Sequence, residues 1–157
     1  MSLTSLEKDG LKLILFGGKG GVGKTTCASS AGLHLSNDFK TLLISTDPAH
    51  SLSDSLGQII GSSIKEVKGV KNLSGIEIDA EIALSKFKKD YESQIRRIFD
   101  TSTYLDQEDI DAVFSLPIPG MDEVMGFKTI VDLIDEAKFD KYIVDTAPTG
   151  HALRLLT

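Results

Sequence analysis

The stretch Phe16-Gly17-Gly18-Lys19-Gly20-Gly21-Val22-Gly23-Lys24-Thr25-Thr26 decides how the rest of the sequence is interpreted. From Gly18 onward it matches the phosphate-binding pattern G-x-x-x-x-G-K-[ST] at every fixed position. Glycines let consecutive backbone N–H groups point at one anion, and a helix that follows adds roughly half a positive charge at its N-terminus. A glycine-rich turn without a ligand is the alternative, but such a turn needs neither so many glycines nor the Lys-Thr pair. We therefore expect Lys24 to meet the β/γ-phosphates of a nucleotide and Thr25 to meet magnesium.

Composition bounds the classes of protein that the chain can belong to. Its 157 residues suit one globular domain, with 41% hydrophobic and 25% charged residues. A net charge of -6 argues against a general nucleic-acid surface, so an anionic ligand must be held locally. The single cysteine, Cys27, excludes an internal disulfide, and zinc could be bound only with residues absent from this chain. We interpret Cys27 as a small core residue.

The sequence contains no candidate for a membrane span or a secretory signal. No apolar run approaches the roughly 20 residues that a transmembrane helix needs, and residues 1–10 are polar. We therefore expect no direct membrane insertion and a cytoplasmic location.

Short apolar runs alternate with helix-compatible segments along the chain, a pattern typical of an α/β fold with a mainly parallel sheet. Strands are expected at 11–16, 41–45, 72–79 and 142–144, with the first of them buried on both faces. Helices are expected at 25–35, 51–56 and 80–99, and another opens at Asp122 and Glu123, with Val124, Phe127, Val131 and Ile134 on one face. We expect helices on both faces of the sheet and residues 80–116 to begin a helical subdomain. The sheet looks unfinished, so residues 1–157 are interpreted as the N-terminal portion of one domain.

An aspartate stands just after two of the predicted strands. Asp47 follows the strand at 41–45, and Asp145 closes the strand at 142–144. Ligands of open α/β sheets bind beyond the carboxyl ends of the strands, so both carboxylates should lie near the phosphate loop. Asp47 could also be a turn residue or a helix cap before Ser51. An aspartate that ends a strand downstream of a phosphate loop is a common magnesium-side carboxylate, which predicts that role for Asp145.

Four segments together resemble the arsenical-pump ATPase family, which includes the ATPases that target tail-anchored membrane proteins. They are Lys19 to Thr25, a deviant Walker A form with a second lysine, and the stretches Ser45-Thr46-Asp47-Pro48-Ala49-His50-Ser51-Leu52-Ser53-Asp54, Pro119-Gly120-Met121-Asp122-Glu123 and Asp145-Thr146-Ala147-Pro148-Thr149-Gly150-His151. The resemblance extends from Leu11 to Leu156 and implies a P-loop NTPase fold. Met121 stands where the family usually has isoleucine, a departure that changes no chemistry.

The resemblance implies specific roles for the residues of these segments. The nucleotide would be ATP with Mg²⁺, and Thr25, Asp47 and Asp145 would lie around the metal. Asp47 would also orient or deprotonate the attacking water, and Lys24 would hold the phosphates. Lys19 would reach across a homodimer to the partner's nucleotide, as an arginine finger does. The expected nucleotide-binding residues are Gly18, Lys19, Gly20, Gly21, Val22, Gly23, Lys24, Thr25 and Thr26.

Four other polar residues have weaker assignments. His50 and His151 lie in the two switch segments and are interpreted as loop histidines bonded to backbone rather than as catalytic groups. His34 is interpreted as structural or solvated. Asp54 could be an ordinary helix residue or a partner of the first switch.

The resemblance leaves the output of the ATPase open. The first expectation is a cytosolic, dimeric targeting factor for tail-anchored membrane proteins, whose partner is a hydrophobic client helix. The alternative is the ATPase subunit of an arsenite efflux pump, whose partner is a membrane protein. A partitioning-type nucleotide-dependent switch or scaffold is a third possibility, against which the Asp47-Pro48-Ala49-His50 segment argues.

Overall fold

The computed structural model describes residues 3–8, 10–47, 49, 51–102 and 120–146; the side chains of residues 95, 98–102 and 122 are outside that description. Its sheet has the strand order β1-β5-β2-β4-β3, in which the first four strands are parallel and β3 is antiparallel to β4. The strands are β1 (Leu13–Phe16), β2 (Thr41–Ser45), β3 (Lys65–Glu66), β4 (Leu73–Glu77) and β5 (Lys141–Asp145). The helices are η1 (Leu3–Glu7), α1 (Lys24–Leu35), α2 (Ser51–Leu56), α3 (Ala80–Ser102) and α5 (Met121–Asp135).

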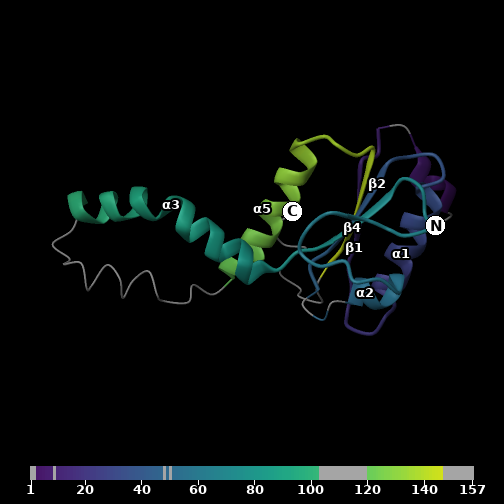
Figure 1. Ribbon diagram of the computed structural model, residues 1–157, viewed down its shortest axis with the longest axis horizontal. Helices are drawn as coiled ribbons and strands as arrows, with labels where there is room; N and C mark the ends of the chain where they lie inside the picture. The colour runs from purple at the N-terminus through teal and green to yellow at the C-terminus, as the bar shows by residue number, and fades with distance from the viewer. Residues whose placement is uncertain (1–2, 9, 48, 50, 103–119, 147–157) are drawn as a thin grey trace.

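Helices cover both faces of the sheet, as expected for an α/β fold (Figure 1). On one face, α1 and α2 pack Ala28, Leu35 and Leu52 against inward-facing residues of the strands. On the other face, Ile130 of α5 packs against Ile76 and other residues of β2, β4 and β5. Strands β2, β4 and β5 are buried along their whole length, which agrees with the apolar runs Leu42 to Ile44 in β2 and Tyr142 to Val144 in β5.

Strand β1 and helix α5 differ in part from the sequence-based expectation. β1 lies at the edge of the sheet that the described strands form, and Leu15 is 39% exposed, so the expectation that it is buried on both faces is wrong. In α5 the residues that bury deeply are Met125 and Ile130, whereas Val124 and Val131 are 44% and 38% exposed. Periodicity places apolar residues on one face of the helix, but it does not show which part of that face meets the sheet.

Helix α1 lies very close to the sheet because its inner face carries small residues. A Cβ added at Gly32 would stand 3.4 Å from Leu73 Cδ1 and 3.7 Å from Leu43 Cδ2. Ala28 and Ala31 are fully buried on the same face. Cys27 is exposed instead, which corrects its interpretation as a core residue.

Helix α3 begins at the sheet and extends well away from it (Figure 1). It contacts α5, and its Phe87 and Tyr91 rings stack with centroids 4.6 Å apart. Among the described residues, no helix combines the length and the apolar character that a bilayer crossing requires.

Candidate functional site: the carboxyl edge of the sheet

Four strand ends lie in one row at the carboxyl edge of the sheet. The parallel register pairs Phe16 with Asp145, Asp145 with Ser45, and Ser45 with Glu77. The backbone beyond the row is tied together, because the N–H of Thr146 donates to Phe16 O at 3.1 Å and the N–H of Thr46 donates to Asp145 O at 3.0 Å. The segments that follow β1, β2 and β5 therefore leave the sheet side by side, as the site of an open α/β sheet requires.

The glycine loop, residues 17–23, connects β1 directly to α1. Gly23 is the residue before the first turn of α1, with φ of 85°, and Gly21 has φ of 76°, a region that side chains other than glycine rarely adopt. This conformation places the glycine loop at the helix N-terminus, which attracts anions. Lys24 Nζ lies 3.4 Å from Lys19 O, so this side chain folds back over the loop. Lys19 and Val22 are exposed.

Thr25 joins the glycine loop to the end of β5. Its hydroxyl donates to Asp145 Oδ2 at 2.6 Å, across 120 residues of sequence, and also lies 3.2 Å from Ser51 Oγ. Asp145 is fully buried, and its Oδ1 has no hydrogen-bond partner among the residues that the structure describes. Burial raises the pKa of Asp145 above its ordinary value, while the Thr25 hydrogen bond and the Lys24 charge lower it and the Asp47 carboxylate raises it.

Asp47 lies close enough to Asp145 for the two carboxylates to repel one another. Its N–H donates to Ser45 Oγ at 3.2 Å, and its Oδ1 accepts a hydrogen bond from the N–H of Ala49 at 3.0 Å. The second bond makes an Asx turn, so part of the turn-forming interpretation of Asp47 is correct. Because Asp47 is only half-buried, its second oxygen can face a ligand at the same edge.

The chemistry of these side chains fits a hard divalent cation. A hydroxyl and a buried carboxylate with one unused oxygen are the ligands that magnesium takes from protein, and magnesium prefers to complete its shell with water and phosphate oxygens. Within the described ranges there is no cluster of three or more His, Cys, Asp or Glu side chains that could hold a metal by itself. Thr25 and Asp145 thus fit a nucleotide-bound ion rather than an all-protein metal cage.

Comparison with known proteins identifies the family of this site. The model of a family described as anion-transporting ATPase matches residues 11–157. The chain belongs to the anion-transporting ATPase family. Its fold is therefore that of a P-loop NTPase, in agreement with the parallel sheet and the glycine loop.

Three curated relatives show how much of the anion-transporting ATPase family's sequence is represented. An ATPase ASNA1 homologue of Paramecium tetraurelia is 45% identical over 152 residues, which are 96% of this chain and 44% of the relative. ATPase get3 of Schizosaccharomyces pombe is 42% identical over 152 residues, again 96% of this chain and 44% of the relative. A putative arsenical pump-driving ATPase of Halobacterium salinarum is 39% identical over 148 residues, 92% of this chain and 22% of the relative. The chain thus spans less than half the length of these proteins.

Two residues at the carboxyl edge were not singled out from the sequence. Ser51, the first residue of α2, contacts Thr25, and Glu77 at the end of β4 is buried in the same row as Asp145. A strand that ends in a carboxylate was a signal for Asp145 and applied equally to Glu77. The strand expected at 72–79 extends past Glu77, so its predicted end is Asp79, whereas β4 ends at Glu77.

Neither His34 nor Asp54 makes a hydrogen bond or ion pair with Thr25, Asp47 or Asp145 in the described part of the site. His34 Nε2 lies 2.6 Å from Glu7 Oε1, so this histidine fastens η1 to α1, in line with a structural role. Asp54 is exposed on α2. His50 and His151 lie outside the described residues.

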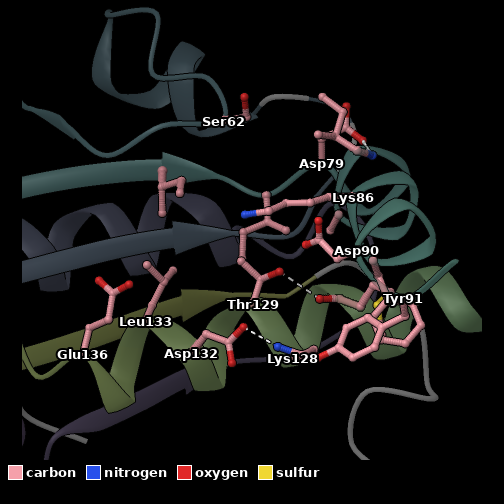
Figure 2. A pocket seen from close by; sticks show the side chains of 16 residues that line it. Ser62, Asp79, Lys86, Asp90, Tyr91, Lys128, Thr129, Asp132, Leu133 and Glu136 are labelled. Atoms are coloured by element: carbon pink, nitrogen blue, oxygen red, sulfur yellow. Dashed lines mark hydrogen bonds and ion pairs between the residues drawn. The ribbon is translucent and has the colours of Figure 1, made fainter. Parts of the chain in front are cut away.

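A separate cleft of about 410 Å³ lies between α3 and α5, on the face of the sheet opposite α1 (Figure 2). Ile78, Phe87 and Met125 supply apolar surface, and charged side chains stand around them. One pair of these charges is neutralised, because Lys128 Nζ lies 2.6 Å from Asp132 Oδ2. The cleft thus combines apolar walls with a polar rim, and its lining includes Ile76 and Ile78, the neighbours of Glu77 in the chain.

Proposed function

We propose that the full-length protein is a cytosolic, homodimeric, magnesium-dependent ATPase that delivers hydrophobic tail-anchored membrane proteins. This chain would supply its phosphate loop and the first part of its two switches. The observation that carries the proposal is the 2.6 Å hydrogen bond between Thr25 and Asp145, with the unused Asp145 Oδ1 beside the glycine loop. Burying a carboxylate oxygen without a hydrogen-bond partner costs free energy. A cation between Asp145 and the phosphates would compensate for that cost.

Each residue at the carboxyl edge has a role in this proposal. Lys24 and the amides of residues 21–26 would hold the phosphates, and the Thr25 hydroxyl and Asp145 would hold magnesium. Bound magnesium would supply positive charge that neutralises the β- and γ-phosphates. Asp47, half-buried and anchored by its Asx turn, orients the attacking water and lies next to the metal. Its repulsion with Asp145 adds negative potential where a cation is to bind.

The homodimer rests on Lys19. Its side chain is exposed on the glycine loop, while its carbonyl faces Lys24 within the same chain. An exposed lysine on a phosphate loop is free to reach a second copy of the loop. A cation supplied in trans stabilises the negative charge of the transition state and raises the rate by about 10³- to 10⁵-fold in related phosphoryl transfers.

The hydrophobic client is supported by the surface of α3 and α5. Ile82, Tyr91 and Val124 are exposed on these helices, and the cleft between them has apolar walls. An exposed apolar surface is suited to covering an apolar helix. Energising an arsenite pump is the second candidate, which the relationship to the Halobacterium protein favours.

Mixing two inactive variants of the full-length protein tests the ATPase and the dimer together. We expect Lys19→Ala and Asp47→Asn each to bind ATP and to lose hydrolysis. Lys19 acts in trans, so a mixed dimer has one intact site, made of Asp47 from one subunit and Lys19 from the other. Equal mixing should restore about a quarter of the wild-type rate of phosphate release, since about half of the dimers are mixed.

The controls separate the possible errors. Lys71→Ala removes another exposed lysine and should hydrolyse ATP normally. If the two variants are inactive separately and the mixture stays inactive, Lys19 does not act in trans. If Asp47→Asn hydrolyses ATP at the wild-type rate, Asp47 has no catalytic role. If arsenite stimulates ATP hydrolysis and the protein does not bind a C-terminal hydrophobic helix, the pump function is favoured over the targeting function.

A further inference from the structure

The end of β4 carries a second buried carboxylate, and its contacts lead to the first switch. Glu77 is 3% exposed and lies beside Ser45, which in turn lies beside Asp145. It is therefore in the row of strand ends from which the phosphate loop and both switches leave the sheet.

The Glu77 carboxylate holds helix α2 and the loop that follows it. Its Oε1 accepts a hydrogen bond from the N–H of Ser53 at 2.9 Å, and its Oε2 accepts one from Ser53 Oγ at 2.9 Å and one from the N–H of Gly61 at 3.2 Å. Ser53 Oγ in turn accepts from the N–H of Ile60 at 3.0 Å. The N–H of Ser53 belongs to the first turn of α2, where it has no acceptor within the helix. The carboxylate thus satisfies donors that would otherwise be left unpaired.

Helix α2 leads directly to the reacting groups of the proposed site. It starts at Ser51, whose Oγ lies 3.2 Å from Thr25 Oγ1, and Asp47 lies just before it in the chain. On its other side, Ser55 Oγ donates to Ser29 Oγ of α1 at 2.9 Å. Glu77 supplies the hydrogen bonds that tie the first turn of α2 to the central sheet, and Leu52 adds apolar packing against the strands.

We propose that Glu77 is a positioning residue for ATP hydrolysis: it holds α2 so that Ser51 and Asp47 face Thr25 and the phosphates. The proposal rests on the ATPase function proposed above. Glu77 binds no nucleotide in this arrangement, so its loss should slow the chemical step and leave nucleotide binding in place. A catalytic group displaced by about 1 Å can lose about 10²-fold in rate.

The test replaces Glu77 by glutamine in the full-length protein. Glu77→Gln keeps the size of the side chain but turns an amide N–H₂ toward donors, either Gly61 N–H or Ser53 N–H. We expect the kcat for ATP hydrolysis to fall by about 10- to 100-fold with KM within about twofold. Ser53→Ala should lower kcat in the same way, and the double variant should lose no more than the worse single variant. Glu81→Gln, the same change on the exposed first turn of α3, should match the wild type.

Hydrogen exchange of the nucleotide-free protein gives a readout that does not depend on turnover. The amides of α2 should exchange faster in Glu77→Gln and at the wild-type rate in Glu81→Gln. Unchanged exchange in α2, a wild-type kcat in Glu77→Gln, or losses from Glu77→Gln and Ser53→Ala that add in full would each overturn the assignment. Should Glu77→Gln not fold, Ser53→Ala decides by the same two measurements. Absence of hydrolysis in the wild type would overturn the proposed ATPase instead, while the exchange data would still decide whether Glu77 holds α2.

Discussion

The ends of β4 and β5 present two buried carboxylates whose surroundings differ sharply. Glu77 accepts three hydrogen bonds from Ser53 and Gly61, spread over both of its oxygens. Asp145 accepts one from Thr25, and its Oδ1 has no partner among the described residues. Both groups lie in the same row of the sheet, on either side of Ser45.

We interpret the difference as one between a carboxylate with a structural role and a carboxylate that would take a ligand. Burying a charge is costly unless hydrogen bonds compensate for the lost water. Glu77 is compensated by the protein itself, whereas Asp145 has an unused oxygen beside an anion-binding loop. A cation that arrives with the phosphates would complete the environment of Asp145 and would leave that of Glu77 unchanged.

The sharpest test of this comparison is the loss of the charge at Asp145. In the full-length protein, Asp145→Asn should lower the rate of ATP hydrolysis by about 10²- to 10³-fold, because it weakens the hold on the magnesium that would neutralise negative charge in the transition state. It should also shift the magnesium dependence of phosphate release to higher concentration. Glu77→Gln should leave that magnesium dependence where it is. An equal shift in both variants would abolish the distinction between the two carboxylates.

The two carboxylates should also affect stability with opposite signs when nucleotide is absent. Since the pKa of Asp145 is raised from its ordinary value of 3.8, the folded protein binds this proton more tightly than the unfolded chain does. The resulting stability is present below the ordinary pKa and is lost as the pH rises through the raised one. Asp145→Asn keeps an acceptor for Thr25 without the charge, so its melting temperature should exceed that of the wild type at neutral pH, by a margin that shrinks toward about pH 4.

Glu77→Gln should instead destabilise the protein by about 1–3 kcal/mol, because it leaves buried donors without acceptors. Thermal and chemical unfolding of both variants across this pH range measure the two effects together. A melting temperature of Asp145→Asn below that of the wild type at neutral pH would show that the Asp145 charge is satisfied in the apo protein.

The smallest expected effect concerns the contact between α2 and α1, which links the surroundings of the two carboxylates. Ser51→Ala removes the hydroxyl 3.2 Å from Thr25 Oγ1, while Thr25 keeps its bond to Asp145. One neutral hydrogen bond contributes about 0.5–1.5 kcal/mol, which corresponds to a loss of about 2- to 10-fold in the rate of hydrolysis. Ser30→Ala, which removes an exposed hydroxyl from α1, is the matched control. Equal rates of steady-state phosphate release in Ser51→Ala and Ser30→Ala would contradict the role of Ser51.

Much of the fold was predictable because its signals are local. The apolar runs of β2 and β5 and the glycine loop before α1 are each contained in a short stretch of sequence. The errors concern environment: Cys27 is exposed, Leu15 lies on an edge strand, and the buried face of α5 is centred on Met125 and Ile130. Each of these depends on which surface is nearby, and that information is not contained in the stretch itself. β3 was missed because two residues carry no usable periodicity.

The phosphate loop was determined by the sequence alone, because its backbone conformation follows from the positions of its own glycines. The pairing of Thr25 with Asp145, across 120 residues, was decided by the tertiary structure, since it requires β1 and β5 to be neighbours in register. The tertiary structure also decides the environment of Glu77, because its hydrogen bonds require β4 to pair with β2 and α2 to pack next to the end of β4. Parallel strands bring distant segments to one edge, and only that alignment distinguishes the carboxylate with a free oxygen from the one that is fully bonded.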